Sequence, residues 1–507
     1  MMIPTITLSE LAGLPVYTAE SGGPFIGSLT FGVGRRDESA PTAGTAHLLE
    51  HLIMHRVGKV GIAHNAATGD ETISFYAQGE PARVADFLNR VAHAVSTLAD
   101  LSDTDVEEQR RIIAAELGDG DERPGRGALL DRFGAQSVGL LDIGSPGHRS
   151  ITRQQVVAFA ETWLHAGNAA LAFTGVMPEG LDVALPAAGA LPHRVPATVI
   201  REGAWAVSGS IPVCISLVLD ASKQRAAGSI AATIIEQGLF AELRRKKALV
   251  YSVDSFSAAL GPGRRFVAYA LDPRPEEVLP TAAAAVSYLR ELAETGPSEE
   301  MMQEALDDWN QFLANPDAAA GLLEGQVDAV LRGRCARDDV KVPDPSGVTA
   351  AEVRSIIAEA LTSLFVTFGE DGHGAESEAV SRELGLSSVE WAPSVYSTLA
   401  KPEFSKRLKS PGVESFAPRS LWSLGRARLV VDHERVACLA SGSSWDVPYA
   451  DTALAFYSEE HRVWGLTDMG GDLAIVDRDE WWGDGKLHRL LAERLPKDRQ
   501  IIIDAVT

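Results

Sequence analysis

The sequence predicts an α+β protein built from two related units and a small β-rich domain after them. Strand-like and helical runs alternate through residues 1–180 and again through 206–372, with several matched segments at similar spacing. Short alternating strands and one amphipathic helix occupy residues 416–507. With 507 residues, 45% of them hydrophobic, the chain has enough apolar side chains for several cores.

The first unit, 1–180, is predicted to hold an antiparallel-rich sheet packed with helices. Strand patterns mark 27–33, 72–77 and 169–174, and helical periodicity marks 44–56, 83–98, 103–117 and 152–164. In helix 103–117 we expect Val106, Ile112, Ile113 and Leu117 to face the core.

The second unit, 206–372, follows an Ala- and Pro-rich stretch at 181–205 that is typical of a linker. It begins with a predicted strand at 213–220. Ile151–Val156 matches Val348–Val353 at an offset of 197, and Phe173–Gly175 matches Val366–Gly369 at nearly the same offset. His47–His51 lies over Thr233–Gln237 at an offset of 186. These offsets predict two α/β half-units that diverged from one ancestor.

The last part of the chain has a different composition. After a polar connecting segment, 373–415, residues 416–507 carry five of the nine tryptophans. Strands are predicted at 427–431, 435–439, 452–457, 462–466 and 473–476, and a helix at 486–495. A small antiparallel barrel or sandwich with one C-terminal helix is expected.

Charge and hydropathy limit the function classes. The net charge of −23 argues against nucleic acid as a partner and favours cationic ligands. No run of 18 apolar residues predicts a membrane span, and the first residues lack a signal-peptide pattern. The three cysteines imply no disulfide framework. We expect a cytoplasmic protein with no membrane partner.

The clearest chemical signal is His47-Leu-Leu-Glu50-His51. Positions i and i+4 of a helix share a face, so His47 and His51 can bind one metal ion. Glu50 lies beside them and can act as a base on a metal-activated water. About 0.02 such motifs are expected by chance at this composition.

A third ligand is needed, and Glu116 is the best candidate. It follows His51 by 65 residues, on helix 103–117, whose apolar face would pack it against the first helix. Periodicity alone leaves open whether Glu116 is a ligand or a solvated helix charge.

Several spaced segments resemble the insulinase/pitrilysin family of inverted-motif zinc peptidases, in its two-domain mitochondrial-processing-peptidase-like branch. These segments are Gly32–His51, Asn65–Tyr76 and Glu107–Glu116, and the resemblance covers about residues 20–370. It implies that His47, His51 and Glu116 bind zinc and that Glu50 is the general base. Because Thr233 and Gln237 stand at the ligand positions of the second unit, one Zn²⁺ per chain is expected.

The resemblance extends to substrate-binding residues. Gly238–Arg244 and Ala248–Tyr251 are similar to the family's Arg/Tyr segment, which implies that Tyr251 stabilises the oxyanion and Arg244 holds the substrate backbone. A basic helix end and ordinary strand packing are the alternatives for these two residues. The segment Asn65, Ala66, Ala67 and Thr68 resembles the family's substrate-binding edge strand.

One position departs from the family pattern. Gln109 stands where a second Glu is usual, seven residues before the ligand Glu116. A neutral amide there implies altered tuning of the zinc and its water, with ligation left intact.

The implied activity is that of a zinc metalloendopeptidase for peptides and for leader or unfolded segments, with basic peptides favoured by the acidic chain. A homodimer is expected, with the zinc unit of one subunit facing the Arg/Tyr unit of the other; a heteromer with a related chain is the alternative. The C-terminal domain is similar to pleckstrin-homology-like domains and is expected to serve docking or assembly. A non-catalytic scaffold or regulatory subunit is the rival function.

Overall fold

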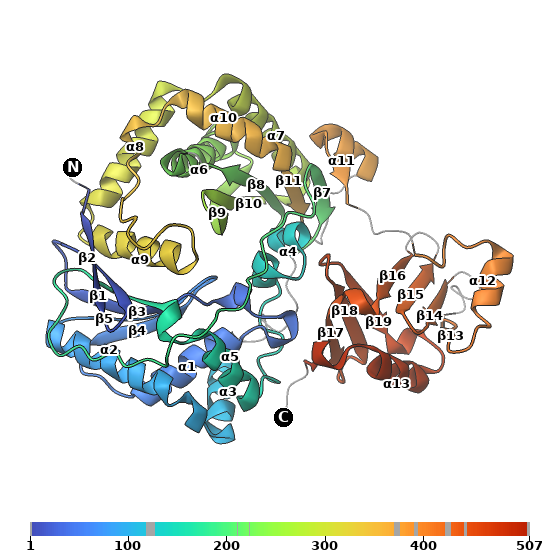
Figure 1. Cartoon of the computed structure of the whole chain (residues 1–507). Helices are drawn as coiled ribbons and strands as arrows, with labels where there is room; N and C mark the ends of the chain where they lie inside the picture. Colours follow the sequence, from blue (N-terminus) through green and yellow to red (C-terminus); the bar gives the residue numbers. More distant parts are fainter. Residues whose placement is uncertain are drawn as a thin grey trace.

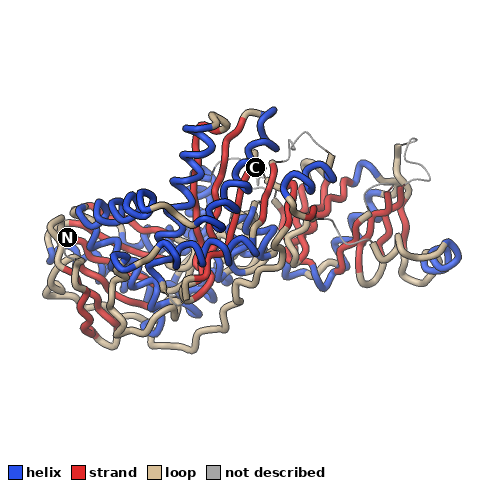
Figure 2. Tube along the Cα trace, turned by 90° about the horizontal axis from the view of Figure 1, so that it is seen from above, coloured by secondary structure: helices blue, strands red, loops and turns tan. Residues whose placement is uncertain are grey.

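The structure, a computed structural model, describes residues 3–117, 127–209, 211–222, 224–369, 376–389, 394–420, 427–440 and 444–503. Two units of sheet and helices lie together, and a third, β-rich domain lies at one side of them in both views (Figure 1, Figure 2). The predicted α+β class with a C-terminal β-rich domain is confirmed.

The first unit contains a six-stranded sheet in the order β1-β2-β6-β3-β5-β4. Its strands are β1 (Ile6–Leu11), β2 (Leu14–Ala19), β3 (Ile26–Phe31), β4 (Ala63–Thr68), β5 (Ile73–Gln78) and β6 (Ala169–Phe173). The helices are α1 (Thr45–Val57), α2 (Pro81–Ser96), α3 (Asp103–Leu117) and α5 (Arg153–Trp163). Leu49 and Leu52 of α1 and Phe87 of α2 pack with Leu29 and Phe75 of the sheet in one core.

The second unit repeats this topology. Its sheet has the order β12-β7-β11-β8-β10-β9. Five strands are shared, β2–β6 in the first unit and β7–β11 in the second. In each unit the first and the last of these pair in parallel, β2 with β6 and β7 with β11, and the other shared strands pair antiparallel. The strands are β7 (Ala204–Val207), β8 (Val213–Asp220), β9 (Val250–Gly261), β10 (Arg264–Pro273), β11 (Phe365–Phe368) and β12 (Ser387–Ser388). The predicted duplication is therefore present in the fold.

The helices of the second unit include one that crosses to the first. They are α6 (Arg225–Leu239), α7 (Val278–Thr295), α8 (Glu299–Ala314), α9 (Ala318–Leu331), α10 (Ala350–Ala360) and α11 (Ser377–Leu384). Leu323 and Val327 of α9 pack against Tyr17 and Ala170 of the first sheet.

The first unit makes a reciprocal contribution through α4 (Ala128–Phe133). Leu129 and Phe133 of α4 form a cluster with Cys214, Phe266 and Ala268 of the second sheet. Each sheet thus packs on one face against a helix that the chain supplies from the other unit.

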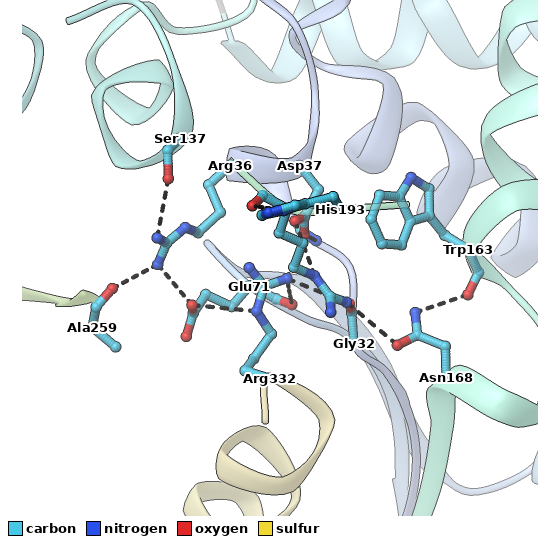
Figure 3. A network of polar contacts seen from close by, with 12 residues as sticks. Gly32, Arg36, Asp37, Glu71, Ser137, Trp163, Asn168, His193, Ala259 and Arg332 are labelled. Atoms are coloured by element: carbon cyan, nitrogen blue, oxygen red, sulfur yellow. Dashed lines mark hydrogen bonds and ion pairs between the residues drawn. The ribbon is translucent and has the colours of Figure 1, made fainter. Parts of the chain in front are cut away.

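A buried charge network joins the two units near the β4–β5 turn (Figure 3). Glu71, in that turn, pairs with Arg36 at 2.7 Å, with Arg332 at 3.3 Å and with Arg334. Asp37, whose side chain is 2% exposed, pairs with Arg332 at 2.6 Å. Because Arg332 and Arg334 follow α9, the network ties the end of the crossing helix to the loops that flank α1 and β4.

The described part of the C-terminal domain consists of two four-stranded sheets and two helices. The sheets have the orders β13-β14-β15-β16 and β19-β18-β17-β20. The strands are β13 (Glu414–Phe416), β14 (Ala427–Val431), β15 (Arg435–Ala440), β16 (Trp445–Pro448), β17 (Thr452–Ser458), β18 (Val463–Asp468), β19 (Leu473–Asp477) and β20 (Gln500–Ile502). The helices are α12 (Lys401–Arg407) and α13 (Asp484–Arg494). All five strands predicted there are present, but the fully antiparallel arrangement is wrong, because β20 follows α13 and pairs in parallel with β17.

This domain packs on the first unit through α4 and the residues after it. Leu130 and Leu140 form an apolar cluster with Leu454, Phe456 and Ile501 of the domain. The Ala135 N–H donates to the Met469 carbonyl at 3.1 Å. Part of the predicted connecting segment, 373–375 and 390–393, lies outside the described residues.

Replacing Glu71 with Ala should destabilise the protein, because three arginines lose a shared, largely buried carboxylate. Breaking a buried ion pair from one side typically costs about 3–5 kcal/mol. We expect a clear fall in the thermal unfolding midpoint of Glu71→Ala and little change for Glu10→Ala, which removes an exposed acid from β1. Equal midpoints for the two variants would contradict this role of the network.

Candidate metal centre

Helix α1 begins at a cap that comes from outside the helix. Gly44 precedes the helix with φ +104°, in the left-handed region that favours glycine. The Glu38 carboxylate accepts hydrogen bonds from the Gly44 N–H at 2.9 Å and the Ala46 N–H at 2.6 Å. A carboxylate at this end satisfies free N–H groups and complements the helix dipole. Glu38 therefore fixes the turn that immediately precedes His47.

The histidines of α1 converge on a carboxylate from α3. The rings of His47 and His51 lie 4.8 Å apart. Nε2 of His47 is 3.8 Å from Oε1 of Glu116, and Nε2 of His51 is 3.3 Å from Oε2. The i, i+4 spacing thus places both imidazoles on one face of the helix, as predicted.

The buried face of helix α3, which positions Glu116, contains fewer apolar residues than the sequence predicts. Val106 and Ile113 are buried, and Glu116 lies three residues after Ile113 on nearly the same side. The prediction that Ile112 points inward is wrong, because its side chain is 47% exposed. One residue along a helix turns the side chain by about 100°, so Ile112 and Ile113 cannot share a face.

The three side chains fit a zinc ion. Their candidate ligand atoms lie within 4.8 Å of one another, and no other such group of three or more occurs among the described residues. Two imidazoles and one carboxylate are a common protein set at catalytic zinc, where a fourth position remains for water. Burial lowers the pKa of His47, and the neighbouring His51 lowers it further. A lowered pKa favours the neutral imidazole that binds metal.

Glu50 is held by the edge strand β4. The Thr68 hydroxyl donates to Oε2 of Glu50 at 2.6 Å. Strand β4 lies at the edge of the sheet, beside β5. Within it Ala66 is buried, whereas Asn65 and Ala67 are exposed. The structure thus places the predicted edge segment next to Glu50, and peptide binding there stays a prediction.

Gln109 lies on α3 two turns before Glu116, and it is 4% exposed. An ionised Glu at so buried a position would need a cationic partner, whereas a neutral amide does not. Its influence on the metal and its water stays a prediction.

Arg244 and Tyr251 form a pair in the second unit. Arg244 lies in a π-helical segment, Phe240–Lys246, that extends α6. Its guanidinium lies over the Tyr251 ring, 4.3 Å from the centroid, and donates to the Tyr251 carbonyl. Asp272 accepts hydrogen bonds from the N–H groups of Tyr251 at 2.8 Å and Ser252 at 2.7 Å. The Tyr251 side chain is 75% exposed and therefore accessible to a partner.

The second unit repeats two side-chain contacts of the metal centre with other residue types. Gln237, at the position that corresponds to His51, donates to Oδ2 of Asp308 on α8 at 2.6 Å. Glu236, at the position that corresponds to Glu50, accepts from the Ser255 hydroxyl at 2.8 Å. With Thr233 and Gln237 in place of histidines, this unit lacks the nitrogen ligands of the first.

Three contacts of the site escaped sequence reasoning. The cap from Glu38 comes from six residues before Gly44, beyond the usual reach of a capping motif. The bond from Thr68 to Glu50 depends on how β4 packs against α1. Asp272 reaches Tyr251 across the β9–β10 pair. Each of these contacts depends on tertiary packing, which local sequence patterns do not reveal.

The fold is a duplicated unit of sheet and helices, and its first half combines a His-x-x-Glu-His helix with a carboxylate from a later helix. These features define the class of proteins with an inverted-motif metal centre. The family follows from two sequence matches. A model described as "Insulinase (Peptidase family M16)" matches residues 27–137, and one described as "Peptidase M16 inactive domain" matches 150–307. The chain belongs to this family, the insulinase/pitrilysin family. The first match includes His47, Glu50, His51 and Glu116, and the second includes Arg244 and Tyr251.

Curated relatives carry zinc-protease names. The chain is 31% identical to an uncharacterised zinc protease of Mycobacterium leprae over 201 residues, 37% of this chain and 42% of that protein. It is 32% identical to one of Mycobacterium tuberculosis over 220 residues, 39% of this chain and 45% of that protein. The chain thus spans less than half the length of the curated relatives that it matches.

Solved structures share the fold. The peptidase M16 inactive domain from Pseudomonas fluorescens has a TM-score of 0.58 at 18% identity, covering 72% of this chain and 98% of that one. A putative M16-like peptidase from Alicyclobacillus acidocaldarius has a TM-score of 0.54 at 19% identity, covering 73% and 99%. The periplasmic protease PqqL from Escherichia coli has a TM-score of 0.57 at 12% identity, covering 87% and 56%. None of the described helices is long and apolar enough to cross a membrane.

The Glu38 cap should give the protein a measurable pH dependence. Burial raises the pKa of Glu38 to about 7, from 4.5, against the lowering effect of the two N–H donors. A raised carboxyl pKa means that the folded state binds the proton more tightly than the unfolded state, so stability rises as the pH falls from above 7 to below 4.5.

Relative to Glu38→Gln, the parent should therefore gain stability on the order of 3 kcal/mol between about pH 8 and pH 4. Thermal unfolding of both proteins with the metal chelated measures this difference. Glu80→Gln, at an exposed glutamate before α2, controls for removal of a carboxylate. Parallel pH profiles for parent and Glu38→Gln would refute the assignment.

Proposed function

We propose that this chain is a zinc-dependent metalloendopeptidase that cleaves peptides and leader or unfolded segments. The observation that carries the proposal is the convergence of His47, His51 and Glu116 on one point beside a tethered Glu50. Family membership and the zinc-protease names of the relatives support it.

The chemistry assigns one task to each residue. A zinc ion bound by His47, His51 and Glu116 supplies the Lewis acidity that makes water nucleophilic near neutral pH. Glu50 accepts the proton of the attacking water and delivers it to the leaving amine. Thr68 occupies one Glu50 oxygen, Oε2, so Oε1 is the oxygen assigned to proton transfer.

Arg244 and Tyr251 act on the substrate. The exposed Tyr251 hydroxyl donates to the oxyanion that forms at the scissile carbonyl, and Arg244 holds a main-chain carbonyl. The stacking restricts the motion of both side chains before substrate arrives, and Asp272 holds the main chain at Tyr251. Less ordering is then required in the transition state.

Substrate selection follows from the edge strand and the charge. An extended peptide that adds to β4 is recognised through main-chain hydrogen bonds, which tolerate varied sequences. The net charge of −23 favours peptides with Lys or Arg, including basic leader segments.

The assembly proposed is a homodimer with composite sites. The metal ligands belong to the first unit and the Arg244–Tyr251 pair to the second, and in the described part of the chain no hydrogen bond or ion pair joins the two groups. A homodimer would bring the groups together across subunits, and a heteromer with a related chain would do the same. The C-terminal domain is assigned to docking or assembly, and the cytoplasmic location stays a prediction.

A non-catalytic scaffold or regulatory subunit is the second candidate. The neutral Gln109 in the buried face of α3 favours it, since the family usually has an acid there. The intact ligand set and Glu50 favour the enzyme.

Replacing Glu50 with Gln should abolish cleavage and leave zinc bound. General acid–base groups contribute roughly 100-fold or more to rate, and Gln cannot accept the proton. Metal analysis and a panel of quenched fluorescent peptides test this, with Glu108→Gln, an exposed acid on α3, as the charge-matched control. All three proteins should bind about one zinc ion per chain, and only the parent and Glu108→Gln should cleave peptides. A metal-free parent with no cleavage would establish the scaffold instead.

Composite sites predict complementation between two inactive variants. Glu50→Gln and Tyr251→Phe, coexpressed with different tags and purified as mixed dimers, should regain about half of the parent activity, because one of the two sites is then intact. Light scattering should report a dimer for each protein. Mixed dimers as inactive as each variant alone would show that a site is built within one chain.

A further inference from the structure

We propose that Thr68 is a positioning residue that holds the Glu50 carboxylate in its reactive orientation. The inference rests on the proposed function, in which Glu50 is the general base. The family resemblance implies for Thr68 only a place at the end of the peptide-binding edge strand. The side chain of Thr68 is assigned a separate role here.

The contact is short and directed at the base. The Thr68 hydroxyl is 2.6 Å from Oε2 of Glu50, whereas the Ala46 carbonyl, its other neighbour, is 3.5 Å away. A hydroxyl has one proton to donate, so the shorter contact receives it. Hydrogen bonds to an ionised acceptor are among the stronger ones in proteins. This bond restricts a side chain that otherwise rotates about three torsions.

The donor is itself rigidly placed. Thr68 is the last residue of β4 and pairs with Ile73, the first residue of β5. Ala66, two residues earlier on the same face, is buried in the core of the first unit. Glu71, three residues later, is fixed by Arg36, Arg332 and Arg334. The Thr68 hydroxyl is thus anchored on both sides and can orient a more mobile partner.

The second unit contains a similar hydrogen bond, from a hydroxyl of its edge strand to a glutamate of its helix, but it lacks the histidine ligands. Ser255 of β9 donates to Oε2 of Glu236 on α6 at 2.8 Å, in a unit that has Thr233 and Gln237 instead of histidines. A purely structural link between edge strand and helix would have similar consequences in both units. A positioning role predicts a catalytic effect in the first unit alone. Ser255 therefore provides an internal control.

The experiment compares Thr68→Val, Thr68→Ser and Ser255→Ala in the full zinc-loaded protein. Val keeps the shape of Thr and removes the hydroxyl, whereas Ser keeps the hydroxyl. For Thr68→Val we expect kcat to fall roughly 10-fold with KM within about 2-fold of the parent, since the bond orients the base and does not bind substrate. Thr68→Ser should restore kcat to within about 3-fold, and Ser255→Ala should leave it unchanged.

Two further readouts separate positioning from loss of structure. Zinc content and the thermal midpoint should stay near the parent values in Thr68→Val. Crystal structures of parent and Thr68→Val should show the Glu50 carboxylate rotated away from its parent orientation in the variant, and this readout needs no turnover.

Each outcome bears on the proposal. An unchanged kcat in Thr68→Val, a loss confined to KM, an equal loss in Ser255→Ala, or an unmoved Glu50 carboxylate would overturn it. A parent that binds zinc and cleaves no peptide would overturn the proposed function, while the crystal comparison would still decide whether Thr68 orients Glu50.

Discussion

The ion pairs of Glu71 with Arg36, Arg332 and Arg334 are the interaction on which the rest of the structure depends. They fix the β4–β5 turn, so they set the position of the strand whose last residue holds Glu50. Through Arg36 and Asp37 they also fix the loop that leads to the Glu38 cap of α1. Because the arginines after α9 come from the second unit, the arrangement of the two units and the geometry of the metal centre are determined together.

The duplication explains how one half became specialised. Both units keep the order of five shared strands and a hydrogen bond between the edge strand and the helix that precedes it in the chain. In the first unit the helix presents His47 and His51 to Glu116; in the second, Gln237 meets Asp308 instead. The second unit has an exposed aromatic–cation pair, formed by Tyr251 of its edge strand β9 and Arg244 of the helical segment before it. The same scaffold thus carries a candidate metal-ligand set in one half and an exposed Arg–Tyr pair in the other.

Local patterns in the sequence were sufficient for much of this fold. Apolar periodicity predicted α3 at 103–117, and a run of apolar residues predicted β8 at 213–220, both with their observed bounds. The His-x-x-Glu-His spacing determined which side chains of α1 converge. The short β20 was not predictable, because its three residues form a strand only beside β17. The Glu38 cap and the Thr68 contact were also missed, since both depend on the packing of distant segments.

The reciprocal crossing of α4 and α9 has a consequence for how the chain can be divided. The boundary near residue 200 separates the two sheets, but it does not separate their cores, because each sheet is covered by a helix encoded on the other side of that boundary. A fragment cut there would expose an apolar sheet face. Two fragments made by such a cut would have to reassemble as an intertwined pair before either sheet regained its covering helix.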